Sequence, residues 1–212
     1  MMQVTEIFRS IQGESSWAGL PCTFIRLTGC PLRCRWCDTV YSFKGGEAST
    51  IDEILVKVKA FGVKLVEVTG GEPLAQAETP ALISRLIAEG YEVLIETSGS
   101  EPIAGIDPKA HIIMDIKCPG SGMHERMHWA NIDTLKSDDE VKFVIASRSD
   151  YDWAKSIIDE YQLVRKVSLL FSPAFGLLKP EDLVNWILED GLDCRLNMQL
   201  HKIIWSPRKR GV

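Results

Sequence analysis

The chain has 212 residues, of which 45% are hydrophobic and 25% are charged, a composition typical of a folded globular protein. This length suits a single domain spanning residues 1–212. The formal net charge of −5 argues against a protein that binds nucleic acid or a membrane surface, because such proteins are usually basic.

No basic segment followed by an apolar stretch opens the chain, and no apolar run approaches the roughly 18 residues of a membrane span. We therefore expect a cytoplasmic protein, in which thiols stay reduced. Three of the six cysteines, Cys22, Cys118 and Cys194, are scattered and are expected to be structural. The basic run Arg208–Arg210 is either a solvated tail or part of a ligand site.

Strand-like and helix-like segments alternate from about residue 22 onward. Thr50 and Glu53 form a capping-box pattern at the start of one helix, and Gly62 follows its end. A helix with Trp153, Ile157, Ile158 and Tyr161 on one face is also predicted, and the last helix is expected to bury Leu183, Val184, Ile187 and Leu188. The segment 119–137 is the least regular. The expected strands are residues 23–27, 65–69, 91–97, 112–116, 140–145, 167–171 and 193–200, and the expected helices include 50–61, 79–90 and 180–191.

This alternation requires parallel strands joined by right-handed crossovers, which leaves an open doubly wound sheet or a barrel. With about six βα units, an α/β partial (β/α)6-like barrel is the better prediction. Polar residues gather where the predicted strands end, at the rim where parallel α/β proteins bind ligands. They include Arg26, Thr69–Glu72, Glu96–Gly99, Asp115, Lys117, Lys142 and Ser172.

Cys30, Cys34 and Cys37 have the spacing C-x3-C-x2-C. A structural zinc site needs four ligands, and an ordinary 4Fe–4S electron carrier needs four cysteines. No second paired-cysteine or paired-histidine motif supplies the missing ligand. Three thiolates and no fourth predict a 4Fe–4S cluster with one open iron.

The motif, with Trp36 before the third cysteine, resembles the signature of the radical S-adenosylmethionine (SAM) superfamily, and Gly70–Pro73 resembles its Gly-Gly-Glu-Pro loop. The resemblance implies that SAM binds the open iron and is cleaved reductively to a 5′-deoxyadenosyl radical. It makes Cys30, Cys34 and Cys37 the catalytic metal ligands. The SAM contacts that it implies are Gly71, Glu72, Ser98, Asp115, Ile116, Lys117 and Ser172.

The segments Ile7–Thr39 and Gln199–Trp205, with the end at Val212, resemble the 7-carboxy-7-deazaguanine synthase family, so the likeness runs from Ile7 to Val212. It implies Mg²⁺-dependent ring contraction of 6-carboxy-5,6,7,8-tetrahydropterin with loss of ammonia, in 7-deazapurine (queuosine) biosynthesis. SAM would be regenerated, and Thr39 would help to hold Mg²⁺. The implied substrate contacts are Ile11, Gln12, Gly13, Glu14, Arg26, Thr69, His201 and Val212.

Three positions depart from the pattern of this family. Ser15 stands where a glycine is common, Asp115 where a serine is common, and Ser172 where a glutamine is common. Asp115 adds a negative charge beside the expected SAM site.

Two alternatives remain open from the residues. One is an activase of the glycyl-radical type, which has the same cysteine spacing, and the other is a non-catalytic iron–sulfur or zinc protein. The family resemblance further implies a homodimer. The low potential of the expected cluster predicts an electron donor of the flavodoxin type, and the acidic net charge predicts no nucleic-acid or membrane partner.

Overall fold

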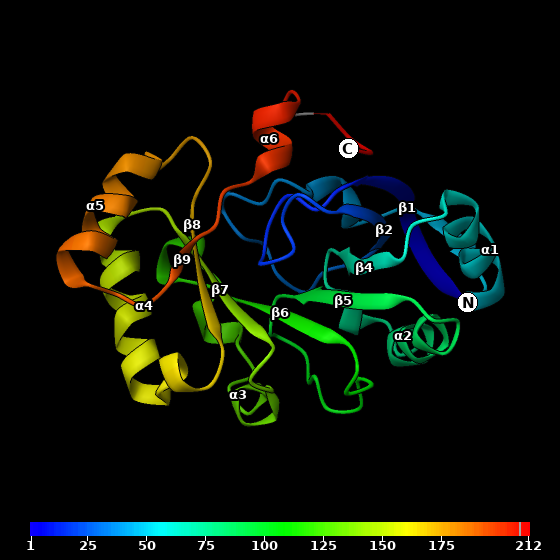
Figure 1. Ribbon diagram of the computed structural model, residues 1–212, viewed down its shortest axis with the longest axis horizontal. Helices are drawn as coiled ribbons and strands as arrows, with labels where there is room; N and C mark the ends of the chain where they lie inside the picture. The colour runs from blue at the N-terminus through cyan, green and yellow to red at the C-terminus, as the bar shows by residue number, and fades with distance from the viewer. Residues whose placement is uncertain (208) are drawn as a thin grey trace.

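The computed structural model describes residues 1–207 and 209–212 and contains one nine-stranded sheet flanked by helices (Figure 1). The sheet order is β3-β1-β2-β4-β5-β6-β7-β8-β9. The strands are β1 (Met2–Ile11), β2 (Pro21–Leu27), β3 (Glu47–Ser49), β4 (Leu65–Gly70), β5 (Glu92–Thr97), β6 (His111–Ile116), β7 (Glu140–Ile145), β8 (Ser168–Pro173) and β9 (Arg195–Leu196). The α-helices are α1 (Ile51–Phe61), α2 (Thr79–Ala88), α3 (Asn131–Thr134), α4 (Arg148–Tyr161), α5 (Pro180–Asp190) and α6 (Leu200–Ile204).

Strands β2, β4, β5, β6, β7, β8 and β9 are parallel, and each pairs with the next of these strands along the chain. The partial α/β barrel predicted from the sequence is thereby confirmed. The expectation omitted β1 and β3, which pair antiparallel at the edge beside β2. Because β3 and β9 are both edge strands, the barrel stays open.

Two apolar clusters hold the sheet. The larger one packs α1, α2, α4 and α5 against the strands, through residues such as Ile54, Leu82 and Leu183. A smaller cluster, which includes Phe24 and Ile113, contains strand residues alone in its buried part. Phe24 and Ile113 also line the cavity described below, so this cluster forms part of the cavity floor.

The residues at its two ends were sufficient to predict helix α1 from the sequence. Thr50 Oγ1 accepts from the Glu53 amide while the Glu53 carboxylate accepts from the Thr50 amide, and Gly62 ends the helix at φ +66°. The prediction for α5 was partly wrong, because Leu183 is buried whereas Leu188 is 73% exposed.

The predicted strand 193–200 was also wrong over most of its length. Only Arg195–Leu196 joins the sheet, and Leu200–Ile204 forms α6. The Asn197 side chain turns the chain inward, since its Nδ2 donates to Ser172 Oγ (2.8 Å) and its Oδ1 accepts from the Ser15 amide (2.8 Å). Among the described residues, no helix is long and apolar enough to cross a membrane.

Candidate active site

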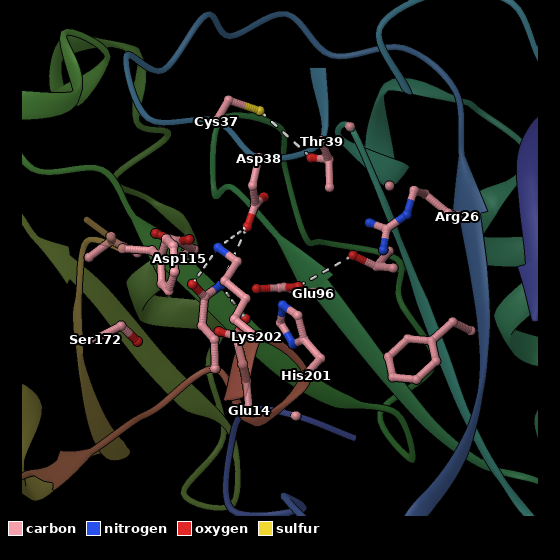
Figure 2. Close-up of a pocket in the computed structure, with 18 of the residues that line it drawn as sticks. Glu14, Arg26, Cys37, Asp38, Thr39, Glu96, Asp115, Ser172, His201 and Lys202 are labelled. Carbon is pink, nitrogen blue, oxygen red and sulfur yellow. Dashed lines mark hydrogen bonds and ion pairs between the residues drawn. The ribbon is translucent and has the colours of Figure 1, made fainter. Parts of the chain in front are cut away.

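One cavity of about 710 Å³ collects the predicted site residues at the carboxyl ends of the parallel strands. Figure 2 shows Cys37, Thr39, Asp115 and His201 around it, although they come from the cysteine loop, β6 and α6. Every site residue proposed from the sequence lines this cavity except Glu72 and Ile116. The sequence therefore predicted a set of residues that folding brings together.

The cysteine loop follows β2 and is fixed by backbone hydrogen bonds. Gly29 N donates to Ser42 O (2.8 Å), Cys37 N donates to Cys34 O (3.2 Å) and Arg35 N donates to Ser121 O (3.1 Å). All six cysteines are free thiols. Burial raises the pKa of the Cys30 thiol and of the Cys34 thiol, and the positive charge of Lys117 acts against that shift.

Gly71 lets the loop after β4 reach the cysteine loop. A Cβ at this position would lie 2.2 Å from Gly29 O and 2.8 Å from Cys30 Cβ, distances that real side chains do not tolerate. The Glu72 amide donates to Gly29 O (2.8 Å) at the same contact. Only glycine permits this approach of two backbones beside the first cysteine.

The three cysteine side chains fit a multi-iron cluster better than a single metal ion. All three line the cavity, yet among the described residues no group of three His, Cys, Asp or Glu side chains is close enough together to hold one ion. A four-iron cluster is wider than an ion and accepts thiolates that are spread around it. The donor set therefore suits such a cluster, which Cys30, Cys34 and Cys37 would hold at the cavity wall.

Glu72 occupies a different position from the one predicted. Its side chain is fully buried and does not line the cavity. Its carboxylate accepts hydrogen bonds from Ser98 N (2.6 Å), Ser98 Oγ (2.5 Å), Thr97 Oγ1 (2.8 Å) and Leu74 N (2.9 Å). This geometry does not support the predicted direct contact with SAM. The Glu72 carboxylate instead orients Ser98 through two hydrogen bonds.

The predicted SAM contacts at the end of β6 divide between the two faces of the sheet. Asp115 and Lys117 line the cavity, and Lys117 Nζ lies 2.8 Å from Asp115 Oδ2. The Ile116 side chain belongs to the apolar core, so only its backbone remains available to a ligand. Ser172 lines the cavity and its hydroxyl accepts from Asn197.

The predicted substrate residues of the loop after β1 are fixed by contacts with β4 and with one another. The Gln12 amide donates to Glu67, and its oxygen accepts from Glu14 N (3.1 Å). Ser15 adopts φ +64°, a left-handed conformation that favours glycine, which explains why glycine suits this position. Ser15 Oγ accepts from Trp17 N (3.1 Å) and so stabilises the turn locally.

The C-terminal segment closes one side of the cavity. Leu200 N donates to Gly13 O (2.9 Å), and Lys202 Nζ donates to Asp38 Oδ2 (2.6 Å). Lys209, Arg210 and Val212 also line the cavity, and the Arg210 guanidinium lies 4.0 Å from the centre of the Tyr41 ring. Of the two interpretations of the basic run, this placement favours a ligand-site role. Arg208 lies outside the described residues.

Several cavity residues had little or no role in the sequence prediction. Lys142 was noted only as a polar residue at a strand end, and Glu96 only within the segment Glu96–Gly99, which could contact SAM. Asp38 was considered only as a possible zinc ligand, and Glu67 and Lys202 were given no role. Burial, together with repulsion from Glu96, raises the pKa of Glu67 to about 8. A glutamate in the middle of the apolar β4 sequence was the only available signal for it.

Comparison with known proteins agrees with the geometry. A profile described as the Radical SAM superfamily matches residues 24–170. The 7-carboxy-7-deazaguanine synthase of Koribacter versatilis is 49% identical, with all of both chains covered. That of Chlorobaculum tepidum is also 49% identical, with all of this chain and 97% of the relative covered.

The chain belongs to the 7-carboxy-7-deazaguanine synthase family. It is therefore a radical SAM enzyme, whose family implies a 4Fe–4S cluster and SAM. The crystal structure of QueE from Escherichia coli shares the fold of this synthase-family chain, with a TM-score of 0.78, 22% identity and 93% coverage of both chains. Family membership favours the synthase interpretation over the activase and the non-catalytic iron–sulfur protein.

Proposed function

We propose that this protein converts 6-carboxy-5,6,7,8-tetrahydropterin to 7-carboxy-7-deazaguanine with loss of ammonia, acting as a carbon–nitrogen lyase. The observation that carries the proposal is that one cavity contains both the cysteine triad and the Gln12, Glu14, Arg26 and Thr69 side chains. A substrate bound to these four residues would lie beside the cluster. When bound, the cluster and SAM would supply the radical that abstracts hydrogen from the carbon bearing the substrate carboxylate.

Arg26 is suited to the carboxylate of this substrate. Its Nε donates to Glu6 Oε1 (2.9 Å), and Tyr41 Oη donates to the same oxygen (2.8 Å). Among the residues that the structure describes, no hydrogen bond uses the two terminal nitrogens of Arg26. Glu6 and Tyr41 thus fix the guanidinium while its fork remains available for a planar anion.

Thr39 supports a magnesium site between the cysteine loop and the substrate. Its hydroxyl lies 3.6 Å from Cys37 Sγ at the cavity wall. Mg²⁺ prefers oxygen ligands and keeps several waters, so the Thr39 hydroxyl, the substrate carboxylate and water would together supply suitable ligands. We propose this ion as a third cofactor, which would orient the carboxylate during the rearrangement.

Two partners complete the proposal: a second copy of the chain in a homodimer, and a low-potential, flavodoxin-like electron donor. The test is anaerobic reconstitution followed by incubation with SAM, dithionite, Mg²⁺ and the carboxytetrahydropterin. We expect 7-carboxy-7-deazaguanine and ammonia in equal amounts from the wild type and neither from Cys34→Ala. A wild type that carries a full cluster and cleaves SAM but leaves the pterin unchanged would refute the proposal.

A further inference from the structure

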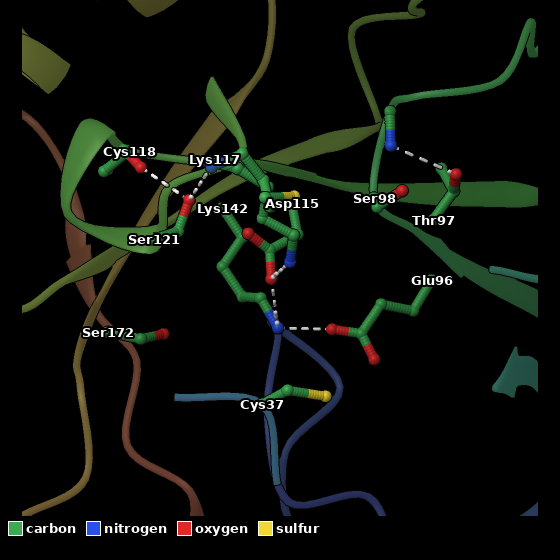
Figure 3. Close-up of polar contacts among 12 residues, drawn as sticks. Cys37, Glu96, Thr97, Ser98, Asp115, Lys117, Cys118, Ser121, Lys142 and Ser172 are labelled. Atoms are coloured by element: carbon green, nitrogen blue, oxygen red, sulfur yellow. Dashed lines mark hydrogen bonds and ion pairs between the residues drawn. The ribbon is translucent and has the colours of Figure 1, made fainter. Parts of the chain in front are cut away.

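Lys142 is a buried lysine that contacts three carboxylates from three different parts of the fold. Lys142 lies on β7 and is only 5% exposed. The ammonium donates to Glu14 Oε2 (3.0 Å) and to Glu96 Oε1, and lies 3.4 Å from Asp115 Oδ2. Figure 3 shows Lys142 between Asp115 and Glu96, with an interaction drawn to each. Two hydrogen bonds and one ion pair thus engage the Lys142 ammonium with carboxylates of the protein itself.

Glu14 and Glu96 each accept a second hydrogen bond from another cavity residue. Glu14 accepts from Gln199 Nε2 (2.9 Å), and Glu96 accepts from Thr69 Oγ1 (3.3 Å). Glu14 and Thr69 belong to the proposed substrate residues, whereas Asp115 belongs to the proposed SAM residues. Lys142 therefore connects the two halves of the cavity through its own charge.

One oxygen of the Asp115 carboxylate has no partner within the described part of the protein. Asp115 is 6% exposed and lines the cavity, and its Oδ1 atom is buried without a hydrogen-bond partner among the described residues. Its other oxygen, Oδ2, contacts Lys117 and Lys142. A buried carboxylate oxygen without a partner is costly, so a hydroxyl or amino donor of a bound ligand would satisfy it.

The charges of Lys142 and its neighbouring carboxylates stabilise one another in the buried site. Burial disfavours ionisation of Glu14, but the positive charge of Lys142 and the hydrogen bonds from Gln199 and Lys142 outweigh it and lower its pKa to about 2. The carboxylates in turn raise the pKa of Lys142 far above its ordinary value. The titratable and charged groups that face this network are Glu14 beside β1, Glu67 on β4, Glu96 on β5, Asp115 and Lys117 on β6, and His201 on α6.

We infer that Lys142 is a positioning residue that balances the charges of Glu14, Glu96 and Asp115 and orients these three carboxylates for their ligands. It acts through these carboxylates and touches neither ligand. The inference deepens the proposed function and rests on it, because Glu14 and Thr69, which donates to Glu96, are assigned to pterin recognition.

The test compares Lys142→Met, which keeps the side-chain length and removes the charge, with Lys142→Arg, which retains a charge. Lys155→Met is the matched control, since Lys155 pairs with Asp190 and Asp152 outside the cavity. The readouts are the Kd of 6-carboxypterin for the reconstituted protein, measured by equilibrium dialysis, and the KM and kcat for the tetrahydropterin. We expect Lys142→Met to raise the Kd and KM at least about tenfold, Lys142→Arg to recover part of the affinity, and Lys155→Met to resemble the wild type.

A pH series separates positioning from a merely structural role. Without Lys142 the pKa of Glu14 rises, so the affinity of Lys142→Met for 6-carboxypterin should fall steeply from pH 8 to pH 5 while that of the wild type changes little. A folded Lys142→Met protein with wild-type affinity and the same pH profile would overturn the inference.

If Lys142→Met alone does not fold, the double variant Lys142→Met/Asp115→Asn is compared with Asp115→Asn, since it removes one buried carboxylate together with the lysine. A Kd at least about fivefold higher in the double variant supports the inference, and equal values overturn it. A wild type that neither binds nor converts the pterin counts instead against the proposed function.

Discussion

Gly13 and His201, 188 residues apart in sequence, are in direct contact. A Cβ at Gly13 would lie 2.6 Å from His201 Nδ1 and 3.2 Å from the His201 backbone nitrogen. The loop that carries Gln12 and Glu14 and the C-terminal helix α6 thus form one wall of the cavity, and glycine at residue 13 sets how closely they approach.

Gly13→Ala is expected to push α6 away from this wall. Because misplacing ligand-binding groups by about an ångström has large kinetic effects, we predict a KM for the carboxytetrahydropterin raised on the order of tenfold to a hundredfold. Reductive cleavage of SAM without pterin should stay within about twofold of the wild type, since the SAM side of the cavity is untouched. An unchanged KM in steady-state assays would show that the contact has no role in binding.

Gly71→Ala tests the approach of the β4 loop to the cysteine loop. Its Cβ would overlap Gly29 O, so the cysteine loop must shift, at a cost of about 1–3 kcal/mol. We predict less iron and sulfide per chain after reconstitution. Gly62→Ala is the matched control: it strains a left-handed residue at the end of α1 by about 1 kcal/mol but meets no atom within 4 Å, and it should keep its full cluster. Equal iron contents in the two variants would contradict this prediction.

Substitutions of Ser15 test whether the left-handed backbone conformation after Glu14 constrains the residue at this position. Ser15→Val should lower the free energy of unfolding by about 1–2 kcal/mol, because a β-branched residue resists φ +64°. Ser15→Gly should be tolerated, with stability within about 1 kcal/mol of the wild type, since it relieves strain but loses the bond to Trp17 N. Chemical denaturation measures both. Equal destabilisation by glycine and valine would show that backbone conformation is not the constraint.

The raised pKa of Glu67 predicts that the stability of the protein depends on pH. Below pH 4.5 its carboxyl is protonated in the folded and unfolded states alike. Between about pH 4.5 and 8 the unfolded chain releases this proton while the folded protein keeps it, so the contribution of Glu67 to stability falls as the pH rises.

Glu67→Gln removes this titration and keeps an acceptor for the Gln12 amide. We expect it to stabilise the protein by roughly 1–3 kcal/mol at pH 8 and by much less at pH 5, as measured by urea unfolding at both pH values. A gain that is equal at the two pH values would mean that Glu67 is ionised in the folded protein throughout the range.

Features encoded in neighbouring residues could be predicted from the sequence. The capping box of α1 needs only Thr50 and Glu53, and the cysteine triad needs only eight consecutive residues. The order of the parallel strands followed from their alternation with helices, and with it the edge of the sheet where the cavity lies.

Features that depend on distant partners could not be predicted. The motif placed Glu72 beside SAM, but its carboxylate is engaged by Thr97 and Ser98, which belong to another strand and its loop. Lys142 has no local motif, because Glu14, Glu96 and Asp115 gather around it only after the sheet has formed. The short β9 likewise results from Asn197, whose partners lie 25 and 182 residues away.

The most direct test of the central claim is the ratio of deazaguanine product to SAM consumed by the reconstituted wild-type enzyme. Mass spectrometry of 7-carboxy-7-deazaguanine and 5′-deoxyadenosine in one reaction measures it. We predict many product molecules for each SAM molecule lost, because the cavity would hold pterin and SAM together and allow the hydrogen atom to return. Deoxyadenosine that accumulates while the carboxytetrahydropterin remains unconverted would contradict the account.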